Sequence, residues 1–193
     1  MPDNELEGIA RAGAEAATPW TDEPVRIVAY DPKWPVRFEE ERAALAALIG
    51  DWVVGGIHHV GSTSVPGLES KPVIDILVGI RDLEEPRSCF GRLAAIGYLH
   101  APYRREEMHW LCKPDPSRRT HHLHLVPVDS ARFRDELAFR DYLRAHNDVA
   151  EEYGALKRRL ASGLSKDREA YTDAKTEFIR TTVRQALGEP ESD

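Results

Sequence analysis

A single carboxylate interrupts an apolar stretch of the sequence, and a carboxylate in that setting can bind a cation. Residues 72–80 contain one charged residue, Asp75. Burying an unpaired carboxylate is unfavourable, so we expect Asp75 to face a cleft, a positive side chain or a metal ion. A simple ion pair with an interior Arg or Lys is the structural alternative. Lys71, just before this stretch, is the cation best placed to accompany it, and we predict catalytic roles for both residues.

A loop rich in glycine and hydroxyl side chains precedes this stretch. It spans residues 61–68 and begins with Gly61, Ser62, Thr63 and Ser64. Glycine lets the backbone approach a ligand closely, and hydroxyl and backbone N–H groups can hold phosphate oxygens. The spacing matches neither a Walker phosphate loop nor the Gly-x-Ser-x-Gly turn of serine hydrolases. We predict that these four residues bind phosphate; the alternative is a turn stabilised by its own side-chain hydrogen bonds.

Three histidines lie within residues 120–126, which alternate as a strand does. His122 and His124 share one face of that strand, and His121 lies on the other. We predict that His122 and His124 join Asp75 to bind a divalent metal ion, with Mg, Mn and Zn as the candidates. A mixed nitrogen and oxygen donor set suits Zn, Mn or Fe better than Mg alone. Hydrogen-bonded histidines that fill a polar cleft without metal are the alternative.

Basic and aromatic side chains recur one helical turn apart near the C-terminus. The pairs are Arg140 with Arg144, Tyr153 with Lys157, and Tyr171 with Lys175. Such pairs can line a pocket for a base and its phosphates. We predict that Arg140, Lys157, Tyr171 and Lys175 bind substrate, although solvated helix faces produce the same pattern.

Periodicity and turn residues predict the elements that position these side chains. The expected strands cover residues 25–30, 51–60, 72–80, 98–101, 108–113 and 120–128. The expected helices are one that begins after residue 33 and others over residues 83–96, 131–145, 149–161 and 167–187. Strands therefore precede a run of helices. This order indicates an α+β fold, with one mixed β-sheet flanked by helices and a C-terminal helical segment.

Length and charge limit the kind of protein. The 193 residues fit one domain, expected at residues 25–187, between an acidic leader (1–24) and a tail (188–193). The leader carries a net charge of −5 and the tail −3, which leaves about +1 of the total −7 for the body. A near-neutral body argues against binding of duplex nucleic acid. With two isolated cysteines and neither an apolar run that could span a membrane nor a signal peptide, we expect a cytoplasmic protein.

The loop and Asp75 together resemble the signature of nucleotidyltransferases. In that signature Gly-Ser follows one strand, and an acidic residue lies on the next. The resemblance implies that the acids hold divalent metal, which bridges the triphosphate of the substrate. The superfamily has a second acid two residues after the first, where this chain has Leu77. The missing carboxylate argues against catalysis by two metal ions.

Seven longer segments resemble the GrpB family. They are residues 30–34, 59–68, 71–76, 120–124, 139–144, 153–157 and 171–175. The resemblance covers about residues 25–187 and implies a nucleotidyltransferase-like fold. Members of this family occur as lone domains and fused to dephospho-CoA kinase. This chain contains no kinase P-loop, so we do not expect it to be that kinase.

The expected function follows from these features and the resemblance. It is metal-dependent nucleotidyl or phosphoryl transfer from a nucleoside triphosphate to a small polar acceptor, so the expected partners are a nucleotide and a small molecule. The alternative is a non-catalytic module of the same fold with a role in regulation or assembly. Leu77 favours that alternative, and the convergence of the loop, Asp75 and the histidine pair favours the enzyme.

Overall fold

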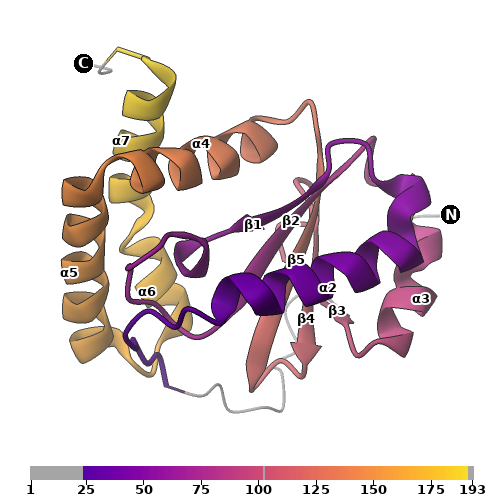
Figure 1. Cartoon of the computed structure of the whole chain (residues 1–193), viewed down its shortest axis with the longest axis horizontal. Helices are drawn as coiled ribbons and strands as arrows, with labels where there is room; N and C mark the ends of the chain where they lie inside the picture. The colour runs from indigo at the N-terminus through magenta and orange to yellow at the C-terminus, as the bar shows by residue number, and fades with distance from the viewer. Residues whose placement is uncertain (1–23, 102, 191–193) are drawn as a thin grey trace, which may run out of the picture.

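The computed structural model describes residues 24–101 and 103–190 (Figure 1). The predicted leader and tail lie mostly outside these ranges and stay predictions. A mixed five-stranded sheet, in the order β1-β2-β5-β4-β3, forms the centre. Its strands are β1 (Ile57–Val60), β2 (Ile74–Ile80), β3 (Leu99–Ala101), β4 (His109–Pro114) and β5 (Arg119–Pro127). The helices are α2 (Trp34–Ile49), α3 (Phe90–Ala95), α4 (Ala131–Ala145), α5 (Asn147–Leu164), α6 (Arg168–Asp173) and α7 (Thr176–Leu187).

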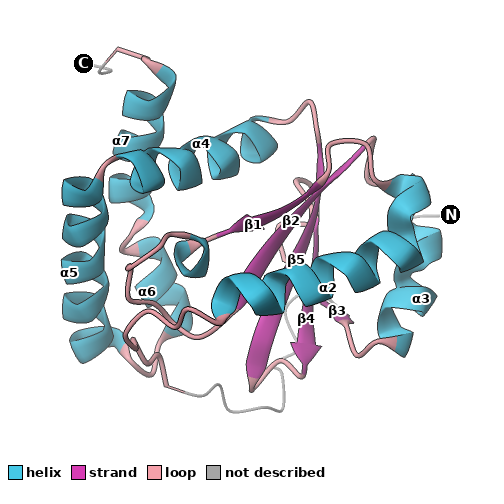
Figure 2. Ribbon diagram, in the orientation of Figure 1, coloured by secondary structure: helices cyan, strands magenta, loops and turns pink. Residues whose placement is uncertain are grey.

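The apolar strand β2 lies inside the sheet, as its composition predicts. It pairs with β1 in the antiparallel direction and with β5 in the parallel direction. The strands β4 and β3 continue the sheet by antiparallel pairing. These strands and the helices around them (Figure 2) confirm the expected α+β class.

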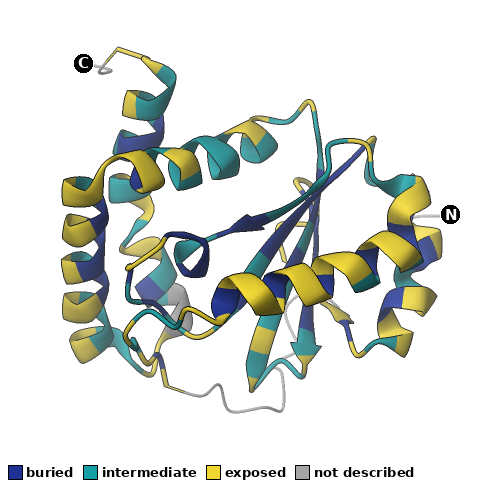
Figure 3. Ribbon diagram, viewed as in Figure 1, coloured by how far each residue is buried: buried dark blue, intermediate teal, exposed yellow. Residues whose placement is uncertain are grey.

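The helices α2 and α3 cover one face of the sheet. Every second residue of β2 is buried there, from Ile74 to Ile80. The helix α2 contributes Trp34, Phe38, Leu45 and Ile49, which are spaced to lie on one side, while its outer side is exposed (Figure 3). Apolar residues four and seven positions apart produce such a stripe on one side of a helix.

The C-terminal helices lie on the other side of the sheet and beside its end (Figure 1). Phe133 and Leu137 of α4 pack on a small apolar cluster that includes Leu77 and Trp110. Further along the chain, α5 and α7 pack against the loop that follows β1, where Leu68 meets Tyr153. The loop is thus held between the sheet and the helical segment.

Two predicted strands are wrong in extent. Residues 25–30 form no strand of the sheet; Val28 makes one isolated bridge with Ser70. An extended segment that is buried on one side alternates in the same way whether or not it has a partner strand. The strand expected over residues 51–60 begins only at Ile57. The N–H groups of Val54 and Gly55 both donate to the carbonyl oxygen of Gly79, and Gly56 has φ +86°, so regular pairing with β2 starts only after Gly56.

Two predicted helices are shorter than expected. The helix expected over residues 83–96 is a 3-10 segment (Glu85–Cys89) followed by the short α3. The last predicted helix is divided into α6 and α7 by Ala174 and Lys175. Neither residue is a helix breaker, so residue type does not indicate this division.

Candidate functional site

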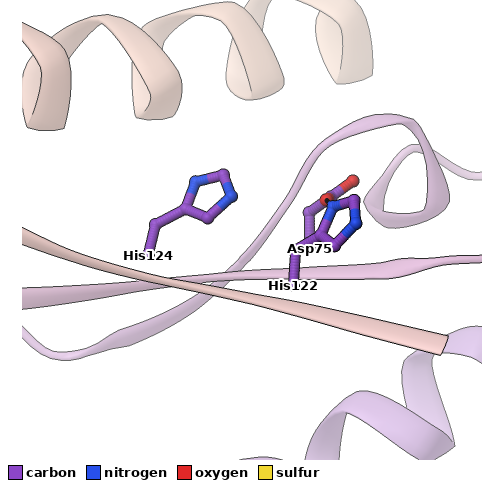
Figure 4. Close-up of side chains that lie close together, drawn as sticks. All are labelled: Asp75, His122 and His124. Carbon is purple, nitrogen blue, oxygen red and sulfur yellow. Dashed lines mark hydrogen bonds and ion pairs between the residues drawn. The ribbon is translucent and has the colours of Figure 1, made fainter. Parts of the chain in front are cut away.

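The structure brings the three predicted metal ligands together on one face of the sheet. Asp75 of β2 and His122 of β5 are register partners, and Oδ1 of Asp75 lies 2.8 Å from Nδ1 of His122. His124 extends from the same side of β5 (Figure 4), and the centres of the two imidazole rings are 6.4 Å apart. Each of the three side chains offers one donor atom, and these atoms lie within 4.8 Å of one another. This is the only such group of three or more His, Cys, Asp or Glu side chains among the described residues.

Asp75 and His122 form a carboxylate–imidazole pair. Burial opposes ionisation of Asp75, but the hydrogen bond from His122 and the neighbouring cations, among them Lys71, lower the pKa of this carboxyl to about 2. Burial lowers the pKa of His122. At neutral pH an ionised carboxylate therefore accepts the Nδ1–H of a neutral imidazole. The remaining nitrogen, Nε2, is buried and has no hydrogen-bond partner among the described residues, so its lone pair is available to a ligand.

His124 makes an equivalent contact with a residue that the sequence reading missed. Its Nδ1 lies 3.3 Å from Oε2 of Glu136, which α4 places over β5. The other oxygen of Glu136 lies 3.0 Å from Nε of Arg132, one helical turn earlier. From sequence, Arg132 and Glu136 form an ordinary i,i+4 surface pair, and nothing in that pattern indicates a histidine partner.

Gly61 allows the loop to approach the carboxylate of Asp75. A Cβ atom at this position would lie 2.3 Å from Oδ2 of Asp75 and 2.9 Å from its Cγ, and the backbone has φ +67°. Only glycine fits both the conformation and the space. The glycine-rich loop therefore contacts Asp75 directly, through the backbone of Gly61.

Three lysines from separate segments approach the same region. Nζ of Lys71 and of Lys175 lie 5.0 Å and 4.4 Å from the centre of the Tyr171 ring. Nζ of Lys157 lies 4.8 Å from the centre of the Tyr153 ring. Lys157 comes from α5, and Lys175 comes from the break between α6 and α7. Four of the predicted substrate or catalytic residues, Lys71, Lys157, Tyr171 and Lys175, are thus neighbours.

Like charges repel one another in this region. Burial and repulsion from the neighbouring lysines lower the pKa of Lys157 to about 7 and that of Lys175 to about 7, although Asp75 opposes both shifts. Burial raises the pKa of Tyr171 to about 12, so this phenol stays neutral. One carboxylate thus acts on three amines. A bound anion would favour the charged form of each amine.

The hydroxyl residues of the loop divide between two sides. Burial raises the pKa of Tyr153, and a hydrogen bond with the side chain of Ser62 opposes this shift, which places Ser62 on the lysine side. Thr63 is fully buried, and its hydroxyl donates to the carbonyl oxygen of Val73 at 3.1 Å. Ser64 donates to the carbonyl oxygen of Gly61 at 2.6 Å. The hydroxyls of Thr63 and Ser64 thus stabilise the loop itself, as the alternative reading expected.

Arg140 and Arg144 hold the loop from the other side. Nε and Nη2 of Arg144 donate to the carbonyl oxygen of Ser64 at 3.0 Å and 2.9 Å. Nη1 of Arg140 donates to the carbonyl oxygen of His59 at 3.3 Å, and its other nitrogens bind Asp141. The predicted role of Arg140 in the substrate pocket does not fit this position.

Two hollows of the described surface lie away from Asp75. One of about 480 Å³ lies between α2, β1 and α4, and Ser64, Arg140 and Arg144 line part of it. The other, of about 530 Å³, lies between α5 and α7. The side chains of Asp75, His122 and His124 line neither, and they are 27%, 16% and 14% exposed. The candidate site therefore lies outside both hollows, and its three side chains are partly exposed on the sheet face.

Leu77 lies where a nucleotidyltransferase would carry its second acid. It is fully buried in the apolar cluster beneath α4, and its register partner is His124. No carboxylate can occupy that position without disrupting the cluster. The second and third donors of the candidate metal site come instead from β5.

These features define an α+β protein in which one sheet face carries a candidate cation site beside a group of lysines. The chain belongs to the GrpB family: the family model described as "GrpB protein" matches residues 24–185. The crystal structure of the conserved protein GrpB from Enterococcus faecalis has a TM-score of 0.77 and 34% sequence identity to this chain. That match covers 84% of this chain and 98% of the other.

Two sequence relatives are longer than the matched region. The UPF0157 protein YqkA of Bacillus subtilis is 34% identical over 162 residues, a match to 84% of this chain and 47% of that protein. The dephospho-CoA kinase of Mycolicibacterium paratuberculosis is 28% identical over 193 residues, a match to 84% of this chain and 46% of that protein. The chain thus spans about half the length of these relatives. The second match agrees with the expected association of the family with dephospho-CoA kinase.

No helix in the described part of the chain has the length and apolar character needed to cross a membrane.

Proposed function

We propose that this chain is a metal-dependent nucleotidyl- or phosphoryl-transferase that uses a nucleoside triphosphate and a small polar acceptor. The observation that carries the proposal is the meeting of three lysines with Asp75, His122 and His124 beside the Gly61 backbone. A polyphosphate with a bound divalent cation has the charge distribution that complements this arrangement.

The donor groups fit a divalent cation. Asp75 is ionised, and His122 offers a buried Nε2 that has no other partner among the described residues. Two imidazoles and one carboxylate suit Zn, Mn or Fe more than Mg alone. Such an ion, when bound, would withdraw charge from the phosphate oxygens during transfer.

The lysines fit the phosphates. Lys157 donates to the carbonyl oxygen of Glu69 at 2.5 Å, which fixes its ammonium group below the loop. Lys175 and Lys71 share the Tyr171 ring, and both repel the charge of Lys157, so the three amines converge on one region. Phosphate oxygens would supply negative charge beside these amines.

The proposed transfer involves no oxidation or reduction, so it needs no redox partner. The acceptor oxygen forms a bond to phosphorus, and the bond from that phosphorus to the bridging oxygen breaks. Pyrophosphate or a nucleoside diphosphate leaves with the electron pair, and the acceptor proton passes to solvent. The residues of this chain bind and orient the phosphates during the exchange.

Leu77 favours a second candidate, a non-catalytic module that binds the same anionic ligand for regulation or assembly. Its burial removes the position from which a second metal would be held. The two candidates share the binding site and differ in turnover.

Calorimetric titration tests the proposal. The full chain is titrated with ATP, GTP, CTP and UTP in the presence of Mg²⁺, Mn²⁺ or Zn²⁺, alongside Lys175→Ala and the exposed control Lys166→Ala. We expect at least one nucleotide–metal pair to bind the wild type and the control, and Lys175→Ala to bind at least about tenfold more weakly. Absence of binding by all four nucleotides, with no metal retained by the purified protein, would refute both candidates. Binding without release of pyrophosphate or diphosphate across a panel of acceptors would favour the non-catalytic module.

A further inference from the structure

The two histidines of the candidate metal site are each held by a carboxylate through Nδ1. Asp75 holds His122 at 2.8 Å, and Glu136 holds His124 at 3.3 Å. The two rings are nearly parallel, with an interplanar angle of 19°. The same nitrogen is engaged in both rings, so each histidine has Nε2 left to bind a ligand.

This arrangement is the one that metal-binding histidines require. A histidine ligand must keep a lone pair on one nitrogen and carry hydrogen on the other, and a carboxylate on the second nitrogen fixes this tautomer and the ring orientation. Loss of such a carboxylate weakens metal binding by about 10- to 100-fold. His124 therefore depends on Glu136 for its tautomer.

Glu136 is itself fixed in place. Its Oε1 pairs with Nε of Arg132 at 3.0 Å, and Nη1 of Arg132 donates to Glu107 at 2.8 Å. The side chains of Arg132 and Glu136 are 21% and 20% exposed, so solvent weakens this chain of contacts little. The chain links the α4 helix to the loop between β3 and β4. With Oε1 held by Arg132, Oε2 is the oxygen that faces His124.

We propose that Glu136 of α4 is the positioning carboxylate of the metal site and acts through His124. This inference rests on the proposed metal site. On β2, the position of the second acid is occupied by the buried Leu77, whose register partner is His124. His124, the proposed nitrogen ligand, thus lies beside Leu77, where the acid is missing, and Glu136 of α4 orients its ring.

The Glu136→Gln substitution isolates this role. Glu136 faces two nitrogens that carry hydrogen, Nε of Arg132 and Nδ1 of His124. A glutamine keeps a similar volume but loses the negative charge that pairs with Arg132 and has one acceptor oxygen instead of two for the Nδ1–H of His124. Glu107→Gln is the matched control, because it removes a carboxylate from the same chain of contacts without touching His124.

The experiment measures metal affinity without turnover. Zn²⁺ affinity is obtained by competition with a chromophoric chelator for the full chain, Glu136→Gln, Glu107→Gln and His124→Ala, and the Co²⁺ absorption spectrum reports ligand geometry. We expect Glu136→Gln to lose about 10- to 100-fold in Zn²⁺ affinity and to change the Co²⁺ spectrum, and Glu107→Gln to stay within about threefold of wild type. Denaturant unfolding of the metal-free variants measures any purely structural effect.

The outcomes separate this inference from the proposed function. If the wild type binds neither Zn²⁺ nor Co²⁺, the metal site itself fails and the role of Glu136 fails with it. If the wild type binds and His124→Ala weakens binding, but Glu136→Gln binds like wild type, only the role of Glu136 is wrong. A Glu136→Gln variant that loses stability yet keeps the wild-type affinity and spectrum also overturns it, since the residue would then act only on the fold.

Discussion

The sheet carries charged side chains on both of its faces, as an acid–base pair on one face and as a group of lysines that repel one another on the other. On the α2 side, Oε2 of Glu41 lies 2.5 Å from Nζ of Lys113 and 3.9 Å from Nε2 of His121. Burial and the charge of Lys113 lower the pKa of His121, so one acid faces one base. On the other side, Asp75 is the carboxylate that acts on three nearby lysines.

This difference separates charges that serve the fold from charges that serve a ligand. A balanced pair gains nothing from an additional ion, and its partners are needed in the free protein. A group of like charges destabilises the free protein, and binding of an ion of opposite charge stabilises it. The comparison therefore predicts opposite responses to substitution on the two faces.

The largest effect is expected on the balanced face. Glu41→Ala leaves Lys113 with its charge in a largely buried position, because the two side chains are 10% and 19% exposed. We expect a loss of about 3–5 kcal/mol in the free energy of unfolding, measured by urea denaturation. The double variant Glu41→Leu with Lys113→Met removes both charges and should recover most of this loss. A single variant within about 1 kcal/mol of wild type would show that the pair is not structural.

Gly61→Ala is expected to have the next largest effect. The new methyl group would overlap Oδ2 of Asp75 and would adopt φ +67°. We expect a loss of about 2–4 kcal/mol by the same measurement, from overlap and backbone strain together. Gly67→Ala is the matched control, since Gly67 has φ +78° but no atom within 4 Å of the added Cβ, and it should cost about 1 kcal/mol.

A double-variant cycle isolates the overlap from the strain. In the Asp75→Gly background, the Oδ2, Cβ and Cγ atoms that Gly61→Ala would meet are all gone, so its cost should fall to that of Gly67→Ala. An unchanged cost in that background would mean that strain alone accounts for the effect.

The lysine group should make the free energy of unfolding depend on pH. The folded pKa of Lys157 is about 7, below its ordinary value of 10.5, so between these values the unfolded chain binds the proton and the folded chain does not. Stability should therefore rise with pH between about 7 and 10.5, by at most about 1.4 kcal/mol per pH unit for one lysine, and be constant in this respect below pH 7. Lys157→Met should reduce the slope measured by urea denaturation. A slope equal to that of wild type in this variant would contradict the depressed pKa.

The three residues of the candidate metal site could be predicted because two simple sequence patterns indicate them. Asp75 is conspicuous in an apolar run, and the period of two in a strand places His122 and His124 on one face. The parallel pairing that sets Asp75 beside His122 could not be read from the sequence, because register depends on which strands become neighbours. The contact of His124 with Glu136 depends in turn on how α4 lies over β5.

Residue type alone could not show that several of the predicted phosphate ligands contact backbone carbonyl groups. Thr63, Ser64 and Arg140 have suitable chemistry, but a hydroxyl or guanidinium group serves a neighbouring backbone carbonyl equally well. The sequence does not state which partner is nearer. The α+β order of elements was easier to predict, because the change from strands to helices extends over many residues.

The smallest effects should distinguish two cations that flank the same loop. Arg144→Gln removes two hydrogen bonds to the carbonyl oxygen of Ser64 and should lower the free energy of unfolding by about 1 kcal/mol, without weakening pyrophosphate binding more than about threefold. Lys175→Met removes a buried charge that its neighbours repel, so at pH 7 it should be as stable as wild type or more stable, while its pyrophosphate affinity falls at least tenfold. Urea denaturation and calorimetric titration with pyrophosphate measure the two quantities in each variant. Loss of stability in Lys175→Met with unchanged pyrophosphate affinity would place this lysine among the structural charges, and the contrast between the two faces of the sheet would no longer hold.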